Sequence, residues 1–300
     1  MGSRKKVLVT GASGMLGHVL LERLSKSGEY EGIGISLKGR EGTMACDLSV
    51  EKDIRALFES QKPDLVINTA AYSDVDGCER DPALAYAANA VAVKNLAALC
   101  GASGAPLLHV STDYVFDGRK NSPYLESDPV SPVNIYGLTK LEGEYHARRC
   151  RSASAVVRTS WLFGPGNPAN FVNAVLARMK REKNVGVLDD QMDAPTSVFD
   201  LCGALEKIAA RLLSGAVKPA AAEIYQVCNN GVTTRLAMAR KIREILSLSD
   251  TDVTRTDPST IRGRLAVRPV YAAMSPAFFE KTFGVKLPGW EESLKEYLLK

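Results

Sequence analysis

The sequence lacks the features that mark several classes of protein. None of its apolar runs approaches the roughly 18 residues that a membrane helix needs. Only the short stretch Val7–Thr10 follows the basic cluster Arg4–Lys6, so we expect neither a membrane span nor a signal peptide. Charges of both signs are spread along the 300 residues and leave a net charge of +4, which is too small to indicate nucleic acid as a partner.

The chain also lacks paired cysteines and clustered histidines. Its six cysteines are scattered, no Cys-x-x-Cys pair occurs, and only three histidines are present. This pattern argues against a disulfide scaffold and against a zinc site. We therefore expect reduced, buried thiols and a cytoplasmic protein.

What the sequence does contain is a regular alternation of short apolar runs with helical periodicity. Near-continuous Val, Ile and Leu runs between helices indicate a parallel sheet that is covered on both faces. The predicted fold class is α/β, a doubly wound parallel sheet of the Rossmann type with a smaller C-terminal α/β region. Strands are expected at 6–10, 32–36, 43–46, 64–70, 106–111 and 155–160, with one long helix over 82–103.

After about residue 164 the alternation loosens. Strand-like runs at 185–188 and 224–227 are mixed there with helices near 170–182, 197–213 and 233–246. We expect residues 1–163 to form one domain and residues 164–300 mainly a second region, with some segments returning to the main sheet.

A glycine-rich turn lies between the first predicted strand and the helix that follows it. In this turn Gly11 allows a tight bend, Gly14 lets backbone amides approach a diphosphate, and Gly17 lets the helix pack closely. The helix N-terminus then stabilises the phosphate charge. We predict a dinucleotide site in residues 1–163; the alternative is a glycine turn without a ligand. Its members are Gly11, Ser13, Gly14, Met15, Leu16 and Gly17.

The end of the second strand indicates which dinucleotide binds. An NAD site usually has an acidic residue there, which bonds the ribose hydroxyl. Here Ser36, Lys38 and Arg40 offer a hydroxyl and two cations, and the first carboxylate is Glu41. These groups suit a 2′-phosphate and favour NADPH, with NADH as the alternative cofactor. The other interpretation is that both cations are solvated loop charges.

Tyr136 and Lys140 are spaced one helical turn apart and therefore share a face of the predicted helix. A free phenol loses its proton only near about pH 10, but a fixed ammonium and the helix N-terminus would lower that pKa. Tyr136 can then donate its proton to a carbonyl, with Thr112 at the end of the fifth strand as a hydrogen-bond partner. We predict Thr112, Tyr136 and Lys140 as the catalytic set; the alternative is a turn threonine and a packing aromatic.

Six motifs follow one another in an order that resembles the dTDP-4-dehydrorhamnose reductases, members of the extended short-chain dehydrogenase/reductase superfamily. They are TGASGMLG, NTAAYSDVDGCERDP, VSTDYVFDG, SPVNIYGLTKLEGE, VRTSWLFGP and DDQMDAPT. The match runs from about residue 5 to 200, with a weaker echo beyond 268. The resemblance implies NADPH-dependent reduction of the C4 ketone of dTDP-4-dehydro-L-rhamnose, NADP in residues 1–163 and substrate mainly in 164–300.

The resemblance also assigns further residues. Lys140 would hold the nicotinamide ribose, and Asn89 would support the proton relay; the alternative is that Asn89 is a helix-surface residue and Trp161 plain core. The remaining implied cofactor contacts are Asp47, Leu48, Ala70, Ala71 and Tyr72. The implied substrate contacts are Val75, Thr112, Asp113, Tyr114, Trp161, Gln191, Thr196 and Arg268.

Several positions depart from the family pattern. Asp193 replaces a glycine, and Tyr271-Ala272-Ala273 replaces a segment with a polar Asn-Ser pair. Val19 stands where some members have a glutamate that binds magnesium at a dimer interface, so we predict no metal. A homodimer is compatible with the family, but the sequence indicates no interface.

Two other functions stay open at this level. Another epimerase or dehydratase of the superfamily is one, although dehydratases place Asp-Glu where this chain has Asp113-Tyr114. A non-catalytic, NADP-binding regulatory subunit is the other, because the β-subunit of methionine adenosyltransferase shares many of these motifs.

Overall fold

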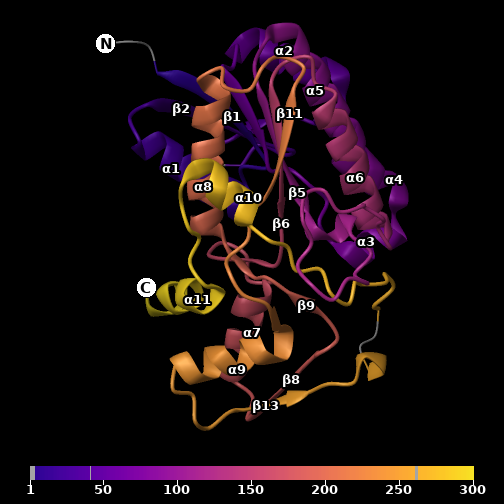
Figure 1. The fold of residues 1–300 in the computed structure, drawn as a ribbon, viewed down its shortest axis with the longest axis vertical. Helices are drawn as coiled ribbons and strands as arrows, with labels where there is room; N and C mark the ends of the chain where they lie inside the picture. The colour runs from indigo at the N-terminus through magenta and orange to yellow at the C-terminus, as the bar shows by residue number, and fades with distance from the viewer. Residues whose placement is uncertain (1–3, 41, 261–262) are drawn as a thin grey trace.

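The computed structural model describes residues 4–40, 42–260 and 263–300. A seven-stranded parallel sheet forms its centre, in the order β11-β6-β5-β4-β1-β2-β3 (Figure 1). The strands are β1 (Lys5–Thr10), β2 (Tyr30–Ser36), β3 (Met44–Ala45), β4 (Leu65–Asn68), β5 (Leu107–Thr112), β6 (Ser154–Thr159) and β11 (Ala222–Gln226). Every residue of β4, β5 and β6 is buried, as expected for a sheet with both faces covered.

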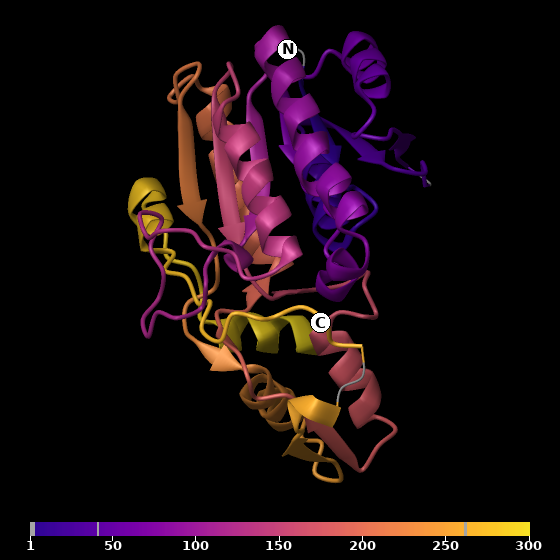
Figure 2. The same cartoon turned by 90° about the vertical axis from the view of Figure 1, so that its right-hand side faces the viewer.

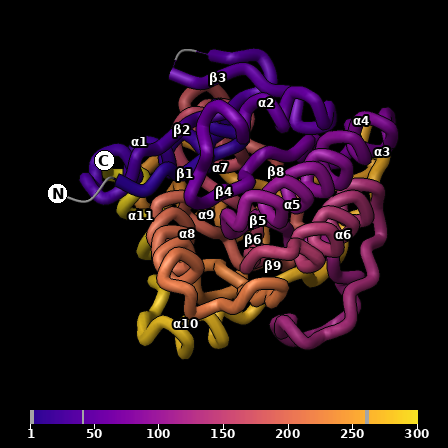
Figure 3. The backbone as a smooth tube through the Cα atoms, turned by 90° about the horizontal axis from the view of Figure 1, so that it is seen from above, coloured from indigo at the N-terminus to yellow at the C-terminus, as the bar shows by residue number. Residues whose placement is uncertain are grey.

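Helices cover the two faces of this sheet, as the view from above shows (Figure 3). α1 (Met15–Lys26) and α8 (Val198–Leu213) pack on one face around Leu20 and Leu205. α2 (Glu51–Gln61), α5 (Ala92–Ser103) and α6 (Ile135–Arg148) cover the other. The predicted doubly wound parallel sheet is confirmed.

The helix predicted over 82–103 is continuous but not uniform. It consists of α4 (Pro82–Tyr86), a π-helical turn at Ala87–Val91 and then α5. Asn89, in the π turn, is fully buried, and its amide bonds both the N–H and the carbonyl of Tyr72. Such single π turns occur mostly at functional sites. The turn brings this asparagine to the loop after β4.

The stretch Pro82–Ser103 is also long and apolar enough to cross a membrane, judged by length and composition alone. Its residues Val93, Leu96 and Cys100 are buried in the core beneath the sheet. The core helix of a globular domain passes the same test, so the composition of this helix carries no further conclusion.

A smaller lobe lies below the carboxyl ends of the strands (Figures 1 and 2). Its core forms where α7, α9 and α11 meet the strand pair β8-β13. Its elements are β7 (Leu162–Phe163), α7 (Phe171–Met179), β8 (Asn184–Val187), β9 (Met192–Asp193), β10 (Thr196–Ser197), β12 (Thr233–Thr234), α9 (Arg235–Ile245), β13 (Asp252–Arg255), the 3₁₀ turn η3 (Pro258–Thr260) and α11 (Trp290–Leu299).

Part of the second half of the chain belongs to the large sheet. The run at 224–227, which the sequence placed in the smaller region, lies in β11 and at its end, and β11 pairs parallel with β6. α10 (Ala277–Phe283) packs on β11, where Phe279 and Phe283 surround Tyr225. Strand order reverses between β1 and β4, and ligands of such sheets bind in the crevice at that point.

Candidate active site

The glycine turn between β1 and α1 packs so closely on the loop after β4 and on itself that a side chain would clash at two of its positions. Gly11 has a φ of +68°, and a Cβ there would lie 2.7 Å from the backbone of Ala70. A Cβ at Gly17 would lie 2.4 Å from the carbonyl oxygen of Gly11. α1 begins after Gly14 with no side-chain cap from the described residues and no acidic residue in its first turn. Its free N–H groups fit a diphosphate.

The other residues predicted in this turn have different surroundings. Ser13 and Gly14 are exposed on the turn, and Met15 is partly buried. Leu16 is buried in the core under α1 and contributes packing rather than a polar contact. Backbone amides of the turn are therefore the groups available to a phosphate.

Gly17→Ala is expected to destabilise the fold by roughly 1–3 kcal/mol, because the new methyl overlaps the Gly11 carbonyl and the turn must move. A moved turn should weaken NADPH binding by about tenfold or more, which calorimetric titration measures. Gly203→Ala is the matched control, since Gly203 also lies in a helix and its Cβ would meet only a side-chain nitrogen 4.0 Å away. Wild-type NADPH affinity in Gly17→Ala would contradict the assignment of this turn.

The end of β2 presents the two predicted cations to solvent. Lys38 and Arg40 are exposed, and neither forms an ion pair within the described ranges. Ser36 is buried, and its hydroxyl is bonded to Thr43 Oγ1 at 2.8 Å, so it stabilises the loop instead of facing outward. Glu41 lies outside the described residues.

The loops after β3 and β4 supply the remaining predicted cofactor contacts. Asp47 accepts bonds from the amide and hydroxyl of Ser49, and Leu48 is buried in the core. Ala70 and Tyr72 are partly buried and Ala71 is exposed along the crevice. Ala70 borders the cradle that Gly11 and Gly17 form, since its backbone would lie 2.7 Å from a Cβ at Gly11.

Asn89 joins the loop after β4 to α6, the helix that carries Tyr136. Its Oδ1 accepts from Tyr72 N–H at 2.8 Å, and its Nδ2 donates to Thr139 Oγ1 at 3.1 Å. Asn89 is therefore a buried clamp between the β4 loop and α6, and not the surface residue that the alternative interpretation proposed.

Thr112, Tyr136 and Lys140 meet at the carboxyl end of β5. α6 begins at Ile135 after the cap Asn134, which places Tyr136 in the first turn. Gly137 lets α6 press on the loop after β5, because a Cβ there would lie 2.1 Å from Tyr114 O. Thr112 is buried and close enough to the phenol to act as its hydrogen-bond partner.

The pKa of the phenol is shifted opposite to the direction that the sequence predicted. Burial raises the pKa of Tyr136 well above its usual value; the Thr112 hydroxyl opposes this shift and the Asp113 charge adds to it. The ammonium of Lys140 is turned to the strand instead, since its Nζ donates to the carbonyl of Val110 at 2.7 Å. Tyr136 is therefore protonated at neutral pH.

Lys140 is itself unusually placed for a charged side chain, at 2% exposure. Burial lowers the pKa of Lys140 to about 8, and the Glu144 carboxylate one turn further along α6 opposes that shift. Near neutral pH the side chain still carries its proton, held between a strand carbonyl and the helix.

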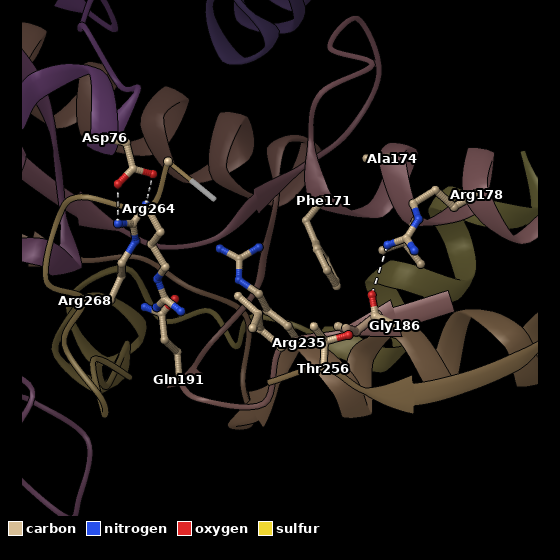
Figure 4. A pocket seen from close by; sticks show the side chains of 14 residues that line it. Asp76, Phe171, Ala174, Arg178, Gly186, Gln191, Arg235, Thr256, Arg264 and Arg268 are labelled. Atoms are coloured by element: carbon tan, nitrogen blue, oxygen red, sulfur yellow. Dashed lines mark hydrogen bonds and ion pairs between the residues drawn. The ribbon is translucent and has the colours of Figure 1, made fainter. Parts of the chain in front are cut away.

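A pocket of about 380 Å³ lies between α3 (Val75–Arg80) and the smaller lobe (Figure 4). Tyr114 separates this pocket from Tyr136. The Tyr114 ring packs edge-on against the Tyr136 ring, with their centroids 5.6 Å apart. The Tyr114 hydroxyl accepts a hydrogen bond of 3.3 Å from Gln191, which lines the pocket. Its polar lining consists mainly of Asp76, Arg178, Gln191, Arg235, Arg264, Arg268 and Thr256.

The predicted substrate residues divide into two groups. Gln191 and Arg268 line the pocket, with Tyr114 next to them. Others do not line it: Val75 begins α3, Thr196 is buried at 1% exposure, and Asp113 is buried behind Thr112 with its carboxylate accepting the threonine hydroxyl at 2.8 Å.

Trp161 does not fit the interpretation as plain core. Its φ is +37°, in the left-handed region that residues with side chains rarely adopt. Its ring is stacked under the Arg235 guanidinium at 4.5 Å, and its buried Nε1 has no hydrogen-bond partner among the described residues. Strained residues cluster at functional sites, which favours a ligand-facing role here.

Sequence reasoning missed the cation at the centre of the pocket, Arg235. Figure 4 shows its guanidinium between Phe171 and the pair Arg264 and Arg268. Arg268 is held by Asp76 in two bonds of 2.7 and 2.6 Å, and Arg264 pairs with Asp190. Arg235 forms no ion pair within the described part of the chain. It begins α9 far from any motif, so no local signal marked it.

The altered segment 271–274 is structural. Tyr271 N donates to Gly118 O and Ala272 N to Met192 O, while Ala273 and Met274 are buried beside Phe116. Small and apolar residues at these positions pack between the two lobes, and Val19 likewise packs in the core under α1.

Comparison with known proteins gives a consistent picture. The model of the RmlD substrate binding domain family matches residues 5–300. The chain is 37% identical over 296 residues to dTDP-4-dehydrorhamnose reductase of Streptomyces griseus, covering 98% of this chain and 93% of that protein. It is 34% identical over 293 residues to the spore coat polysaccharide biosynthesis protein SpsK of Bacillus subtilis (strain 168), covering 98% and 96%.

Solved structures agree with these matches. The dTDP-4-dehydrorhamnose reductase of Bacillus anthracis, solved in complex with NADP, has a TM-score of 0.89 at 29% identity and covers 99% of both chains. The dTDP-glucose 4,6-dehydratase of the same organism reaches a TM-score of 0.81 at 17% identity over 98% of this chain and 96% of that one, a likeness of fold alone.

Proposed function

The chain belongs to the RmlD substrate binding domain family, and from that premise we propose that it uses NADPH to reduce the C4 ketone of dTDP-4-dehydro-L-rhamnose. In broader terms, the relatives support an NADPH-dependent oxidoreductase that acts on a nucleotide-linked sugar. The single observation that carries the proposal is the Thr112–Tyr136 pair, set between a glycine cradle and a pocket with several arginines.

NADPH would be held along the crevice at the carboxyl ends of the strands, where the strand order reverses. The cradle amides would bind the diphosphate, Lys38 and Arg40 the 2′-phosphate, and Lys140 the nicotinamide ribose. When bound, the cofactor supplies the hydride. The exposed positions of the two cations, neither of which is ion-paired with any residue in 4–40, 42–260 or 263–300, support NADPH rather than NADH.

Tyr136 is the proposed proton donor. Reduction of a ketone needs an acid that still holds its proton at neutral pH, and burial keeps this phenol protonated. As negative charge develops on the carbonyl oxygen, the phenol donates to it and Thr112 orients the phenol. Tyr136 is thus in the protonated state that reduction requires, while the direction of its pKa shift contradicts the sequence prediction.

The arginines of the pocket are the proposed site for the nucleotide diphosphate. Arg268 and Arg264 are already neutralised by Asp76 and Asp190, so Arg235 is the cation whose charge a ligand phosphate can balance. Burial lowers the pKa of Arg235, as expected for a half-buried cation whose guanidinium lies over the rings of Trp161 and Phe171. An anion that binds there recovers part of that desolvation cost.

Arg235→Met is expected to raise the KM for the nucleotide sugar by about 10- to 100-fold, as for the loss of a hydrogen bond to a charged group. Its kcat and its NADPH affinity should change little, because Arg235 is separated from Tyr136 by Tyr114 and Gln191. Steady-state kinetics measure both constants. Arg240→Met, an exposed arginine on the same helix, is the control; equal effects in the two variants would contradict a diphosphate site at Arg235.

The test of the proposed function is NADPH oxidation by the purified protein, followed by absorbance over a panel of dTDP- and UDP-linked 4-keto hexoses. We expect the fastest turnover with dTDP-4-dehydro-L-rhamnose, and slower turnover when NADH replaces NADPH. Tight NADPH binding without oxidation of any sugar in the panel would overturn the proposal and leave a regulatory, NADP-binding subunit.

A further inference from the structure

Asp193, which stands where the family pattern has a glycine, lies directly behind the proposed catalytic pair. It ends β9 at 1% exposure, and it faces Asp113, which follows β5 at 2% exposure. Two carboxyl groups so deep in a protein are costly unless a proton or a cation neutralises them. Neither the cofactor cradle nor the pocket uses them.

The hydrogen bonds around the two carboxyl groups leave one oxygen of each unpaired. Asp113 Oδ1 accepts from the Thr112 hydroxyl at 2.8 Å, and Asp193 Oδ1 accepts from Ala194 N–H at 2.7 Å. Each Oδ2 is buried and has no donor within the described ranges. Each carboxyl group shifts the pKa of the other, which indicates that the two buried side chains, each with an oxygen that has no donor in the described part of the chain, lie side by side. Since two carboxylates are both acceptors, that contact needs one proton between them.

We infer that Asp193 is a positioning residue that shares one proton with Asp113 and thereby holds the Asp113 carboxylate against the hydroxyl of Thr112. The threonine hydrogen is then directed at Asp113. Thr112 Oγ1 also accepts from Tyr114 N–H at 3.2 Å, which leaves one lone pair of this oxygen for the phenol of Tyr136. This chain of contacts runs from Asp193 through Asp113 and Thr112 to the proton donor. The inference rests on the proposed reductase function.

The charges around the pair support a single shared proton. Burial raises the pKa of Asp113 to about 6, and burial together with the Asp113 charge raises that of Asp193 well above its usual range. The two carboxyl groups therefore titrate as a pair that keeps one proton at a pH where two isolated carboxyl groups would both be ionised. The titratable and charged groups that act on or respond to the pair are Arg235, Tyr114, Tyr136, Tyr271 and Cys228.

The pair should set the acidic limit of catalysis. Below about pH 6 Asp113 gains a proton and its charge-assisted bond to Thr112 is lost, so kcat should fall there. In Asp193→Asn the amide still donates to Asp113 Oδ2. The acid limb of the pH profile of kcat should therefore stay at its wild-type position. Asp193→Gly, which restores the family residue, leaves that oxygen without a donor, and the limb should move up by about one to two pH units.

The first experiment is the pH dependence of kcat for the wild type, Asp193→Asn and Asp193→Gly with the best sugar of the panel. A merely structural role would change the level of kcat in the glycine variant without moving its acid limb, and that result would overturn the inference while the reductase function stood. A wild type inactive on every sugar would instead count against the proposed function.

A second experiment needs no activity. Asp193 has a raised pKa in the folded protein, so its contribution to stability is present below its ordinary pKa and is lost as the pH rises. The difference in Tm between Asp193→Asn and wild type should therefore become more favourable to the variant between about pH 5 and about pH 8. Asp252→Asn, at a carboxylate with 79% exposure, is the control. Equal differences at both pH values would show that Asp193 holds no proton.

Discussion

Tyr136→Phe is expected to lower kcat by a factor on the order of 10²–10⁴, the usual contribution of a positioned proton donor. The substitution removes one oxygen and keeps the ring, which packs edge-on against Tyr114 at 5.6 Å. Thr112 and Lys140 keep their own partners, Asp113 and the Val110 carbonyl, so the cofactor crevice should be undisturbed. NADPH affinity is therefore expected to stay near its wild-type value while turnover falls.

The matched control for this variant is Tyr145→Phe, which removes the same atom from an exposed ring on the same helix. Single-turnover kinetics with saturating NADPH separate the chemical step from product release. If Tyr136→Phe kept more than about a tenth of the wild-type single-turnover rate, the phenol would not be the proton donor. An equal loss in Tyr145→Phe would point to a defect of α6 instead.

Arg158→Met is expected to destabilise the protein by about 3–5 kcal/mol, because it leaves a carboxylate buried without its cation. The Arg158 and Glu144 side chains are 3% and 1% exposed and are joined by two bonds of 2.9 and 2.7 Å. Ser111 also donates to Glu144 at 2.6 Å, and the Phe116 ring lies 5.2 Å from the guanidinium. The pair connects β5, β6 and α6 directly behind the proposed catalytic residues.

Urea unfolding monitored by circular dichroism measures this effect. The double variant Arg158→Met with Glu144→Met should recover most of the lost stability, since no unpaired charge then stays buried. Arg55→Met is the control for an exposed pair, with Glu51 as its partner, and should cost at most about 1 kcal/mol. A cost as small as this for Arg158→Met would mean that water or another group reaches Glu144.

Local sequence predicted the sheet well because its signals are local. The apolar runs at 106–111 and 155–160 differ from β5 and β6 by one residue at each end, and the glycine spacing marks a turn whose geometry only glycine permits. The strand–turn–helix context then identified the cradle. The helix over 82–103 was located with its correct ends, but its π turn was not, because that turn depends on bonds between Asn89 and a loop 17 residues earlier.

The missed features all depend on contacts between distant parts of the chain. The sequence predicted that some segments after residue 164 return to the main sheet, but not which ones: β11 joins β6 although 62 residues separate the ends of these strands, a pairing that its apolar run alone does not specify. Arg235 reaches the pocket only because α9 packs in the smaller lobe beside Trp161. The predicted direction of the Tyr136 pKa shift was wrong. Spacing shows which residues share a helix face, but burial and the charge of Asp113 decide whether the pKa rises or falls.

The sequence by itself determined the alternation of strands and helices, the glycine cradle and the Tyr136–Lys140 spacing, because periodicity and backbone conformation are properties of neighbouring residues. Only the tertiary structure decided where Arg235 points, that Asp193 meets Asp113, and that the phenol keeps its proton. Those three outcomes depend on desolvation and on charges brought together from separate elements, and neither quantity exists until the chain has folded.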